Sequence, residues 1–218
     1  MYNFDYVPKS EYMPVKKEVI ELINKVRNEL RGSFTFDHRF IGSTDRKLIT
    51  CDFSSNIGYD FDVNLIINDD DEEYSSEEIK PLLINAFQKH MGGYGYNKIE
   101  NSTRVITIEL IDHRKSCIMH SCDFAIVYNY TDKHGNKRQQ YIHYNKKQQS
   151  YYWREQSSAI YLLPQKEDWL RKHNLWNDVR ELYRWKKNNN NNPYKKSRSL
   201  YAETINELYH SNNGPKLK

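Results

Sequence analysis

Apolar residues follow a helical spacing near the start and the end of this 218-residue chain, and a strand-like spacing between them. Across residues 14–31 the spacing predicts an amphipathic helix, because Pro14 suits its first turn and Gly32 suits its end. The middle of the chain holds short runs of β-branched and aromatic residues, which are typical of strands. These strands are expected near residues 34–37, 39–41, 60–67, 104–110, 117–130 and 139–144.

Local signals place a second helix and a turn within this middle part. Ser75 and Glu78 have the spacing of a capping box, which predicts a helix over residues 77–90. The glycine pair at 92–93 is expected to end that helix. The polar segment 132–136 predicts a hairpin connection between the last two strands.

The last third of the chain is expected to be helical. Beyond Pro164 the apolar residues return to helical spacing, with a break near Asn174. The Asn-rich segment 188–193 predicts a polar linker or loop, and a final helix is expected over 199–210.

The order of these elements predicts the fold class. A helix, two strands, a helix, several strands and then helices indicate an α+β core with a mixed or antiparallel sheet and flanking helices, followed by a helical C-terminal part. A doubly wound parallel sheet is disfavoured, because strands and helices do not alternate regularly. We expect two domains, residues 1–150 with the sheet and the N-terminal helix, and residues 151–218 with the C-terminal helices.

Composition indicates a polar globular protein of the cytoplasm. Hydrophobic residues make up 38% of the chain and mean hydropathy is −0.94, while 18 Tyr and 8 Phe supply core material. No apolar run approaches the roughly 18 residues that a membrane helix needs, so no membrane partner is expected. The N-terminus lacks the pattern of a secretory signal, and three cysteines form no even disulfide framework.

The net charge of +4 conceals an asymmetry between the two halves. Residues 131–218 hold 18 Lys and Arg against 8 Asp and Glu, whereas residues 1–130 hold 15 against 21. A basic second half suggests an anionic ligand such as a polyphosphate or a nucleic acid. A solvated helical surface would give the same pattern, so charge alone does not decide between them.

The predicted strand at residues 60–67 places two carboxylates on one face, because alternate side chains point to opposite faces. The opposite, apolar face consists of Phe61, Val63, Leu65 and Ile67. Asp60 and Asp62 repel each other at such close range, and a divalent cation such as Mg2+ would remove the conflict. The alternative is the solvated face of an ordinary amphipathic strand.

A third acid occurs in a similar setting on a later predicted strand. Asp123 points away from the apolar Phe124 and Ile126 and shares its face with Ala125 and Val127. An acid on such a face lies near a strand end or is paired with another group. If the two strands are neighbours, Asp123 completes a three-carboxylate cluster with Asp60 and Asp62.

At this point the chain resembles a known family, the DNA polymerase β-like nucleotidyltransferase superfamily. Its signature is an apolar residue with Gly-Ser, an acid-x-acid strand and a third acid on a later strand. The helical C-terminal part resembles the branch of oligoadenylate synthase, cyclic GMP-AMP synthase and the bacterial CD-NTases. The matching residues are Phe40-Ile41-Gly42-Ser43, Asp60-Phe61-Asp62-Val63 and Cys122-Asp123-Phe124.

The resemblance implies an enzyme that moves a nucleoside monophosphate from an NTP donor such as ATP to a hydroxyl acceptor and releases pyrophosphate. Residues 1–150 would then be the catalytic domain. Asp60, Asp62 and Asp123 would be the catalytic residues and hold Mg2+ or Mn2+. The acceptor could be a nucleotide, as in second-messenger synthases, an RNA end, a protein hydroxyl or a small antibiotic, and the alternative is a catalytically silent nucleotide- or RNA-binding protein.

The resemblance also implies a set of phosphate contacts. Gly42 would let the backbone approach the phosphates, and Ser43 would donate hydrogen bonds to them. Lys196 and Ser197 of the helical part would contact the β- and γ-phosphates, although a solvated loop after the Asn run is the commoner explanation. The segment 44–59 between Ser43 and the first acid is longer than the family pattern, which leaves the pose of Ser43 open.

Two other groups of residues have competing explanations. The zinc-type side chains are His113, Cys117, His120 and Cys122. Their spacing is not that of a zinc knuckle, and Cys117 would face away from His120 and Cys122 on a strand, so ordinary packing is preferred. Tyr94 and Tyr96 could stack on a nucleobase or could pack on the sheet as turn residues.

Overall fold

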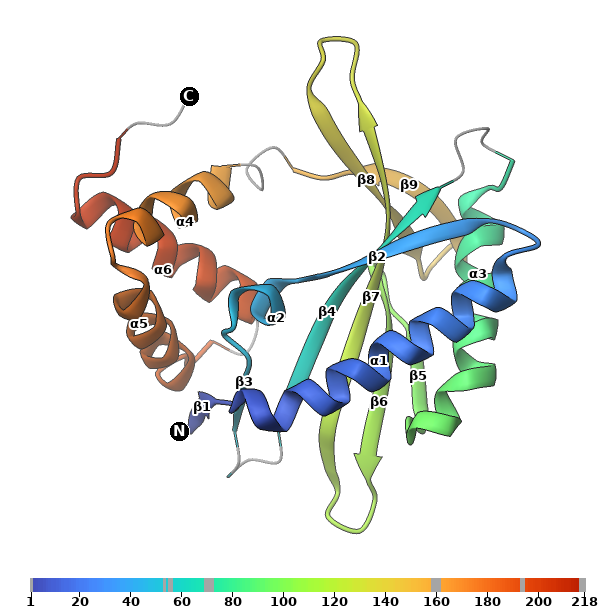
Figure 1. Ribbon diagram of the computed structural model, residues 1–218, viewed down its shortest axis with the longest axis horizontal. Helices are drawn as coiled ribbons and strands as arrows, with labels where there is room; N and C mark the ends of the chain where they lie inside the picture. The colour runs from blue at the N-terminus through green and yellow to red at the C-terminus, as the bar shows by residue number, and fades with distance from the viewer. Residues whose placement is uncertain are drawn as a thin grey trace. The chain divides into compact units, whose positions relative to one another are not determined.

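The computed structural model describes residues 2–52, 54, 57–68, 73–157, 162–192 and 195–215. The chain divides into two compact units, which are described separately. The sheet unit contains residues 6–51 and 56–156, and the helical unit contains residues 1–5, 52–55 and 157–218. Figure 1 labels the elements of both units.

The sheet unit carries most of the secondary structure. Its helices are α1 (Lys9–Leu30), α2 (Gly42–Arg46), α3 (Ser76–His90) and the short 3-10 helix η1 (Met91–Tyr94). Its strands are β2 (Thr35–Ile41), β4 (Ile57–Asn68), β5 (Lys98–Asn101), β6 (Val105–Asp112), β7 (Cys117–Thr131), β8 (Lys137–Asn145) and β9 (Ser150–Glu155). The short strands β1 (Phe4–Tyr6) and β3 (Thr50–Asp52) each fall across the division between the units.

The sheet is mixed, as the sequence predicts. Its central path runs β1-β3-β4-β7-β6-β5, while β2 pairs with β4, β8 with β7, and β9 with β8. Strands β4 and β7 are parallel, whereas the β2–β4, β5–β6, β6–β7, β7–β8 and β8–β9 pairs are antiparallel. The predicted α+β class with a mixed sheet is confirmed, and the parallel pair β4–β7 lies at the centre of the path.

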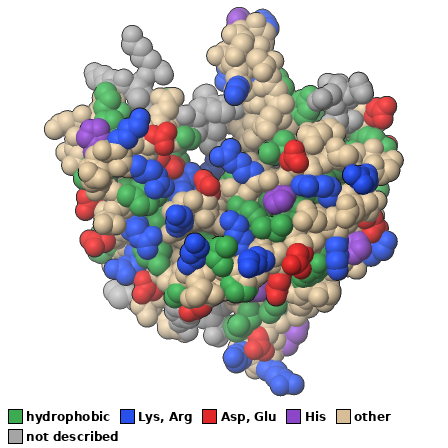
Figure 2. All heavy atoms as spheres, viewed as in Figure 1, with side chains coloured by type: hydrophobic (Ala, Val, Ile, Leu, Met, Phe, Trp, Pro, Cys, Tyr) green, Lys and Arg blue, Asp and Glu red, His purple; other side chains and the backbone are tan. Residues whose placement is uncertain are grey.

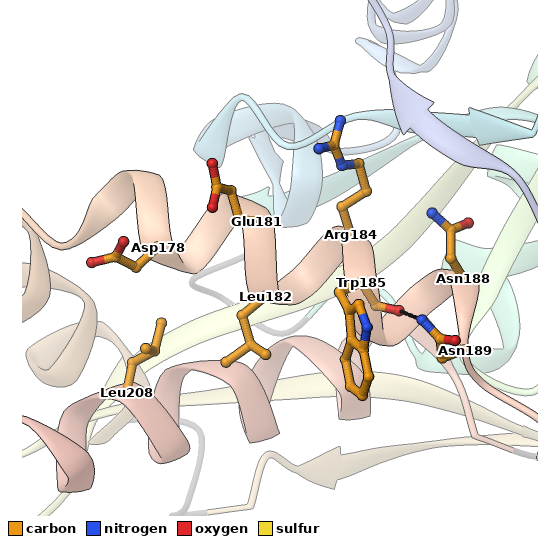
Figure 3. Close-up of a pocket in the computed structure, with 8 residues that line it drawn as sticks. All are labelled: Asp178, Glu181, Leu182, Arg184, Trp185, Asn188, Asn189 and Leu208. Carbon is orange, nitrogen blue, oxygen red and sulfur yellow. Dashed lines mark hydrogen bonds between the residues drawn. The ribbon is translucent and has the colours of Figure 1, made fainter.

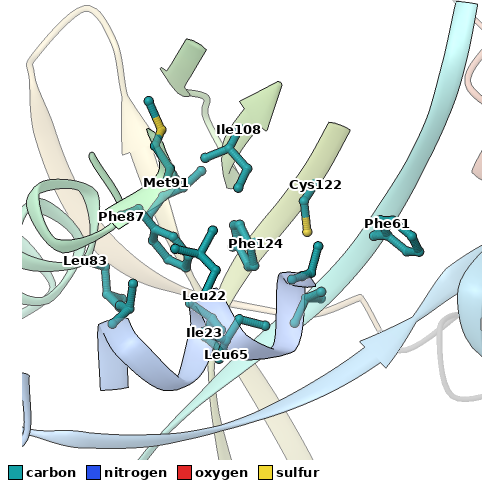
Figure 4. Packing of buried hydrophobic residues seen from close by; sticks show 14 of the residues in the cluster. Leu22, Ile23, Phe61, Leu65, Leu83, Phe87, Met91, Ile108, Cys122 and Phe124 are labelled. Atoms are coloured by element: carbon teal, nitrogen blue, oxygen red, sulfur yellow. The ribbon is translucent and has the colours of Figure 1, made fainter. Parts of the chain in front are cut away.

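Helices α1 and α3 pack on one face of this sheet and bury the main core (Figure 4). Leu22 of α1 and Leu83 of α3 are fully buried with Phe61 of β4. The rings of Phe87 and Phe124 stack with centroids 4.3 Å apart. Side chains in β4 and β7 therefore alternate as predicted. The apolar side chains point toward the helices, and the acids point toward the opposite face.

Helix α1 begins at Lys9, five residues before the predicted start. The preceding residue, Pro8, ends the non-helical segment, and Tyr12 already packs in the core. Pro14 therefore lies inside the helix, where its missing N–H costs one hydrogen bond that the burial of the apolar stripe offsets. The helix therefore begins after Pro8 and not at Pro14, because tertiary packing of the first turn stabilises the earlier start.

The predicted hairpin between β7 and β8 is present and projects from the sheet (Figure 1). The Asp132 N–H donates to Asn136 O and the Gly135 N–H donates to Asp132 O, both at 2.9 Å. Gly135 adopts φ +79°, which glycine reaches without steric cost. Basic and histidine side chains gather at the tip of this hairpin (Figure 2).

The predicted capping box at the start of α3 is also present. The Glu78 carboxylate accepts hydrogen bonds from the Ser75 N–H at 2.9 Å and from the Ser75 hydroxyl at 2.7 Å. Replacing Ser75 by Ala should lower the free energy of unfolding by about 1 kcal/mol, the usual cost of losing an N-cap hydroxyl. Urea denaturation measures this, with Ser33→Ala in an exposed turn as the control; an equal effect of both would contradict a capping role.

The helical unit contains α4 (Leu162–Lys172), α5 (Trp176–Asn188) and α6 (Ser197–Ser211). The expected break falls between α4 and α5, where Asn174 adopts φ +59°. Its core consists of Leu170, Val179, Tyr183, Leu200, Tyr201, Ile205 and Tyr209. The expected loop at 188–193 includes Pro193, which lies outside the described residues. No helix in the described part of the chain has both the length and the apolar character needed to cross a membrane.

Candidate active site

The parallel strands β4 and β7 bring the three predicted acids onto one face of the sheet. Their register pairs Asp62 with Asp123 and Asp60 with Ser121. Directly paired residues share a face, and Asp60 shares the face of Asp62 because it lies two positions away. Asp60 is exposed, whereas Asp62 and Asp123 are half-buried. Segments far apart in the chain thus place three carboxylates side by side on the face away from α1 and α3.

Asp123 is partly withdrawn from water on this face. Burial is the main cause that raises the pKa of Asp123 to about 6, and the negative charge of Asp60 acts in the same direction. A hydrogen bond opposes this shift, because the Thr107 hydroxyl donates to Asp123 Oδ1 at 2.6 Å. The face is therefore a region of concentrated negative charge with partial exclusion of water.

Gly42 lies against the second of these acids. Strand β2 ends at Ile41, which pairs with Asp62, and α2 begins with Gly42 at φ +64°. A Cβ atom at Gly42 would overlap the Oδ2 atom of Asp62. Both the positive φ and this close approach require glycine, so the Gly-Ser turn and the acid strand are in direct contact.

Among the described residues, no group of three or more His, Cys, Asp or Glu side chains is already arranged to hold a metal ion. The donor chemistry of the acid face nevertheless fits a divalent cation. Carboxylate oxygens are the ligands that Mg2+ prefers, and Asp62 and Asp123 are direct register partners. A cation would offset both the repulsion between the acids and the burial cost at Asp123.

Three solved structures with a similar fold are cyclic dinucleotide synthases. The STING-associated CdnE c-di-GMP synthase from Capnocytophaga granulosa is 13% identical, with a TM-score of 0.59, over 94% of this chain and 63% of the synthase. The Vibrio cholerae DncV cyclic AMP-GMP synthase with its linear intermediate is 18% identical, with a TM-score of 0.54, over 98% of this chain and 54% of DncV. The Elizabethkingia meningoseptica CdnE cyclic dinucleotide synthase, solved with GTP and Apcpp, is 12% identical, with a TM-score of 0.51, over 88% of this chain and 68% of that enzyme.

This chain has the fold of these synthases. The predicted resemblance is thereby confirmed for the fold alone. The chain spans 63% and 54% of the length of the first two synthases. No family model matches the sequence, and no curated protein matches it.

The other predicted phosphate contacts are distributed between the two units of the chain. Ser43 is half-buried in the first turn of α2, and its backbone O accepts a hydrogen bond from the Leu48 N–H at 2.8 Å. Lys196 and Ser197 stand at the start of α6 in the helical unit, and both are exposed. The role of all three toward a triphosphate stays a prediction.

The long segment between Ser43 and Asp60 contains regular structure that the sequence did not reveal. Helix α2, strand β3 and the first residues of β4 occupy most of it. Residues 53, 55 and 56 lie outside the described part. The additional length is thus used largely for secondary structure after the Gly-Ser turn.

The zinc-type side chains do not converge on one site. His120 and Cys122 are buried on the helix-covered face, where the His120 ring stacks on Tyr59 with centroids 5.7 Å apart. Burial lowers the pKa of His120 to about 4, so this imidazole is neutral and packs as a core residue. Cys117 lies on the opposite face, with its Sγ atom 3.7 Å from Sδ of Met119.

The two candidate stacking tyrosines lie on the same helix-covered face and not on the acid face. Tyr96 is 2% exposed, and its ring packs edge-on against His120 at 5.2 Å. Tyr94 packs beside the core and carries the Lys25 ammonium 4.9 Å from its ring centroid. The packing alternative holds for both residues.

A pocket of about 820 Å³ in the helical unit is formed by α5 and α6 (Figure 3). The Asn188 side chain is already engaged there, because it accepts from the Phe4 N–H at 2.6 Å and donates to Phe4 O at 3.0 Å. Asn189 donates to the backbone O of Trp185, whose side chain is 61% exposed. None of the residues predicted for the chemistry lines this pocket, so it is not the candidate active site.

Thr107 is a site residue that sequence reasoning missed. It occupies a polar position between the buried Ile106 and Ile108 of β6, on the face of the acids. The only signal in the sequence was this interruption of an apolar strand, and strand alternation alone explains it. The pairing of β6 with β7 shows the contact with Asp123.

An alanine at Gly42 tests the contact with Asp62. Gly42→Ala should weaken binding of an NTP with Mn2+ at least about tenfold, the usual scale for disturbing a metal-site residue. Gly135→Ala is the matched control, since Gly135 also has a positive φ but no atom within 4 Å of an added Cβ. Both variants should lose about 1–2 kcal/mol of stability to backbone strain, and Gly42→Ala should lose more because its Cβ meets the Asp62 carboxylate. Equal nucleotide binding by the two variants would contradict a site role for Gly42.

Proposed function

We propose that this chain is a metal-dependent nucleotidyltransferase. It would transfer a nucleoside monophosphate from an NTP to a hydroxyl acceptor and release pyrophosphate. The observation that carries the proposal is the register of β4 and β7, which pairs Asp62 with Asp123 and keeps Asp60 on the same face. The similarity of the fold to the synthases supports the proposal. Packing of the core does not explain the three acids, because they lie on the sheet face opposite the core.

The chemistry requires one bond to form and one to break. The acceptor oxygen bonds to the α-phosphorus, the α-phosphorus separates from the oxygen that bridges to the β-phosphorus, and pyrophosphate leaves. Asp123 is the proposed acceptor of the hydroxyl proton, since burial raises its pKa to about 6. Asp60 and Asp62 orient the triphosphate together with the Gly42 backbone and Ser43.

Mg2+ or Mn2+ fits the three carboxylates. When bound, such ions neutralise charge on the phosphates and lower the pKa of the attacking hydroxyl. Asp60 and Asp62 would hold the ion that accompanies the triphosphate, and all three acids would hold the second. Asp123 would therefore act mainly on the acceptor hydroxyl, whereas Asp60 and Asp62 would also bind the ion that accompanies the triphosphate.

A nucleotide is the acceptor that we favour. The solved structures that share this fold include a synthase with a linear dinucleotide intermediate and one with GTP and Apcpp. The basic second half of the chain is also compatible with an anionic acceptor, including an RNA end. We propose a cytoplasmic location, where NTPs are available and free thiols such as these three stay reduced.

Incubation with each α-32P-labelled NTP, singly and in pairs, with Mg2+ or Mn2+ tests the proposal. Labelled products and pyrophosphate should form, and separation of the products identifies the acceptor. The triple variant Asp60→Asn/Asp62→Asn/Asp123→Asn should form neither. Tight binding of NTPs without turnover under all these conditions would instead support the catalytically silent binding protein.

A further inference from the structure

We infer that Thr107 is a positioning residue that fixes the Asp123 carboxylate for metal and acceptor. This inference rests on the proposed function of the acid face. Thr107 contacts no predicted substrate atom, and it would act through Asp123 alone. Nothing in the family signature of Gly-Ser and three acids includes this position.

The contact is built by strand pairing and not by a flexible loop. Strands β6 and β7 are antiparallel, and their register places Thr107 directly opposite Asp123. The flanking pairs Ile106–Phe124 and Ile108–Cys122 are fully buried, which holds both backbones in place. Threonine has a stiff χ1 angle in a strand, so its hydroxyl is delivered to one position.

The hydroxyl holds one oxygen of the carboxylate at a defined place. Its Oγ1 atom lies 2.6 Å from Asp123 Oδ1, a short hydrogen bond of the kind made to an ionised acceptor. Thr107 on β6 and Asp62 on β4 are the register partners of Asp123 on its two sides. The Thr107 bond therefore sets the rotation of the carboxylate relative to Asp62, which is the geometry that a shared cation requires.

A hydroxyl suits this task better than a basic side chain. Within the described residues, Asp123 makes no ion pair with Lys, Arg or His. An ammonium or guanidinium partner would neutralise the charge that a metal ion needs, whereas a neutral donor orients the carboxylate and leaves its charge intact. Groups that orient metal ligands in this way commonly affect metal affinity or activity by about 10- to 100-fold.

The test compares Thr107→Val, which keeps the shape but lacks the donor, with Thr107→Ser, which keeps the donor. Mn2+ binding is titrated by electron paramagnetic resonance with a saturating non-hydrolysable NTP analogue. Thr107→Val should weaken the Mn2+ site that depends on Asp123 by about tenfold and lower kcat without changing KM for the NTP. Thr107→Ser should remain within about threefold of the wild type, because it retains the hydrogen bond.

Thr131→Val is the matched control, since Thr131 is an exposed strand residue at the far end of β7. Thermal melting identifies any general loss of folding, and valine is well tolerated in strands. Wild-type Mn2+ affinity in Thr107→Val, or a Thr107→Ser variant as impaired as Thr107→Val, would overturn the inference. Absence of Mn2+ and NTP binding in the wild-type protein would overturn the proposed function itself, and this inference with it.

Discussion

Replacing Asp123 by Asn should reduce turnover at least about 100-fold while NTP affinity changes little. The substitution keeps the size of the side chain and removes the charge, and positioned proton transfer typically contributes about 100- to 10,000-fold. The hydrogen bond with Thr107 can survive, because the asparagine oxygen accepts as the Oδ1 atom does. The loss is therefore chemical and not structural. NTP binding persists because Asp60 and Asp62 remain to hold the ion that accompanies the triphosphate.

Two measurements on the same protein decide this outcome. Single-turnover rate and nucleotide affinity are determined for Asp123→Asn once an acceptor is known. Asp178→Asn in the helical unit is the control, because it removes one exposed carboxylate that is not among the three predicted acids. A near-normal rate in Asp123→Asn would refute its catalytic assignment. An equal collapse of rate and binding would mean that Asp123 also holds the triphosphate.

The double variant Asp60→Asn/Asp62→Asn should lose nucleotide binding, which Asp123→Asn should retain. Affinity for an NTP analogue with Mn2+ should fall at least about 100-fold, since loss of one supporting group at a metal site already costs about 10- to 100-fold. Both side chains keep their size, and they point away from the core that Phe61 and Val63 build. Folding should therefore change little, and the repulsion between the two acids would disappear.

Isothermal titration with a non-hydrolysable NTP analogue measures this loss, with Mn2+ present and absent. The control is Asp178→Asn/Glu181→Gln, which removes the same amount of charge from exposed positions of α5. A crystal structure with analogue and Mg2+ should show metal within coordination distance of both acids. Metal bound elsewhere, with Asp60 and Asp62 paired to basic side chains instead, would rule out the assignment.

Features that depend on neighbouring residues could be predicted from the sequence. The alternation across β4 determined that Asp60 and Asp62 share a face opposite Phe61. Helix α3 starts where the capping box required, and the break near Asn174 separates α4 from α5. The interactions behind these features span only a few residues, so the sequence contains all the information that they need.

Local sequence signals gave a wrong prediction, or left two explanations open, at positions where contacts with distant segments determine the structure. The proline at position 14 suited a helix start, yet packing of Tyr12 extends α1 back to Lys9. Tyr96 had two equal explanations in the sequence, and its burial against His120 decided for packing. Burial against distant segments outweighs local preference at each of these positions.

The sequence by itself determined which residues are acids on strand faces, and through the family resemblance it predicted that they belong together. Only the tertiary structure decided that β4 and β7 pair in parallel with Asp62 opposite Asp123, that Gly42 lies against Asp62, and that Thr107 binds Asp123. Strand order and register depend on contacts between segments far apart in the chain. Alternation along a strand sets the face of a side chain, but it does not set which strand lies beside it.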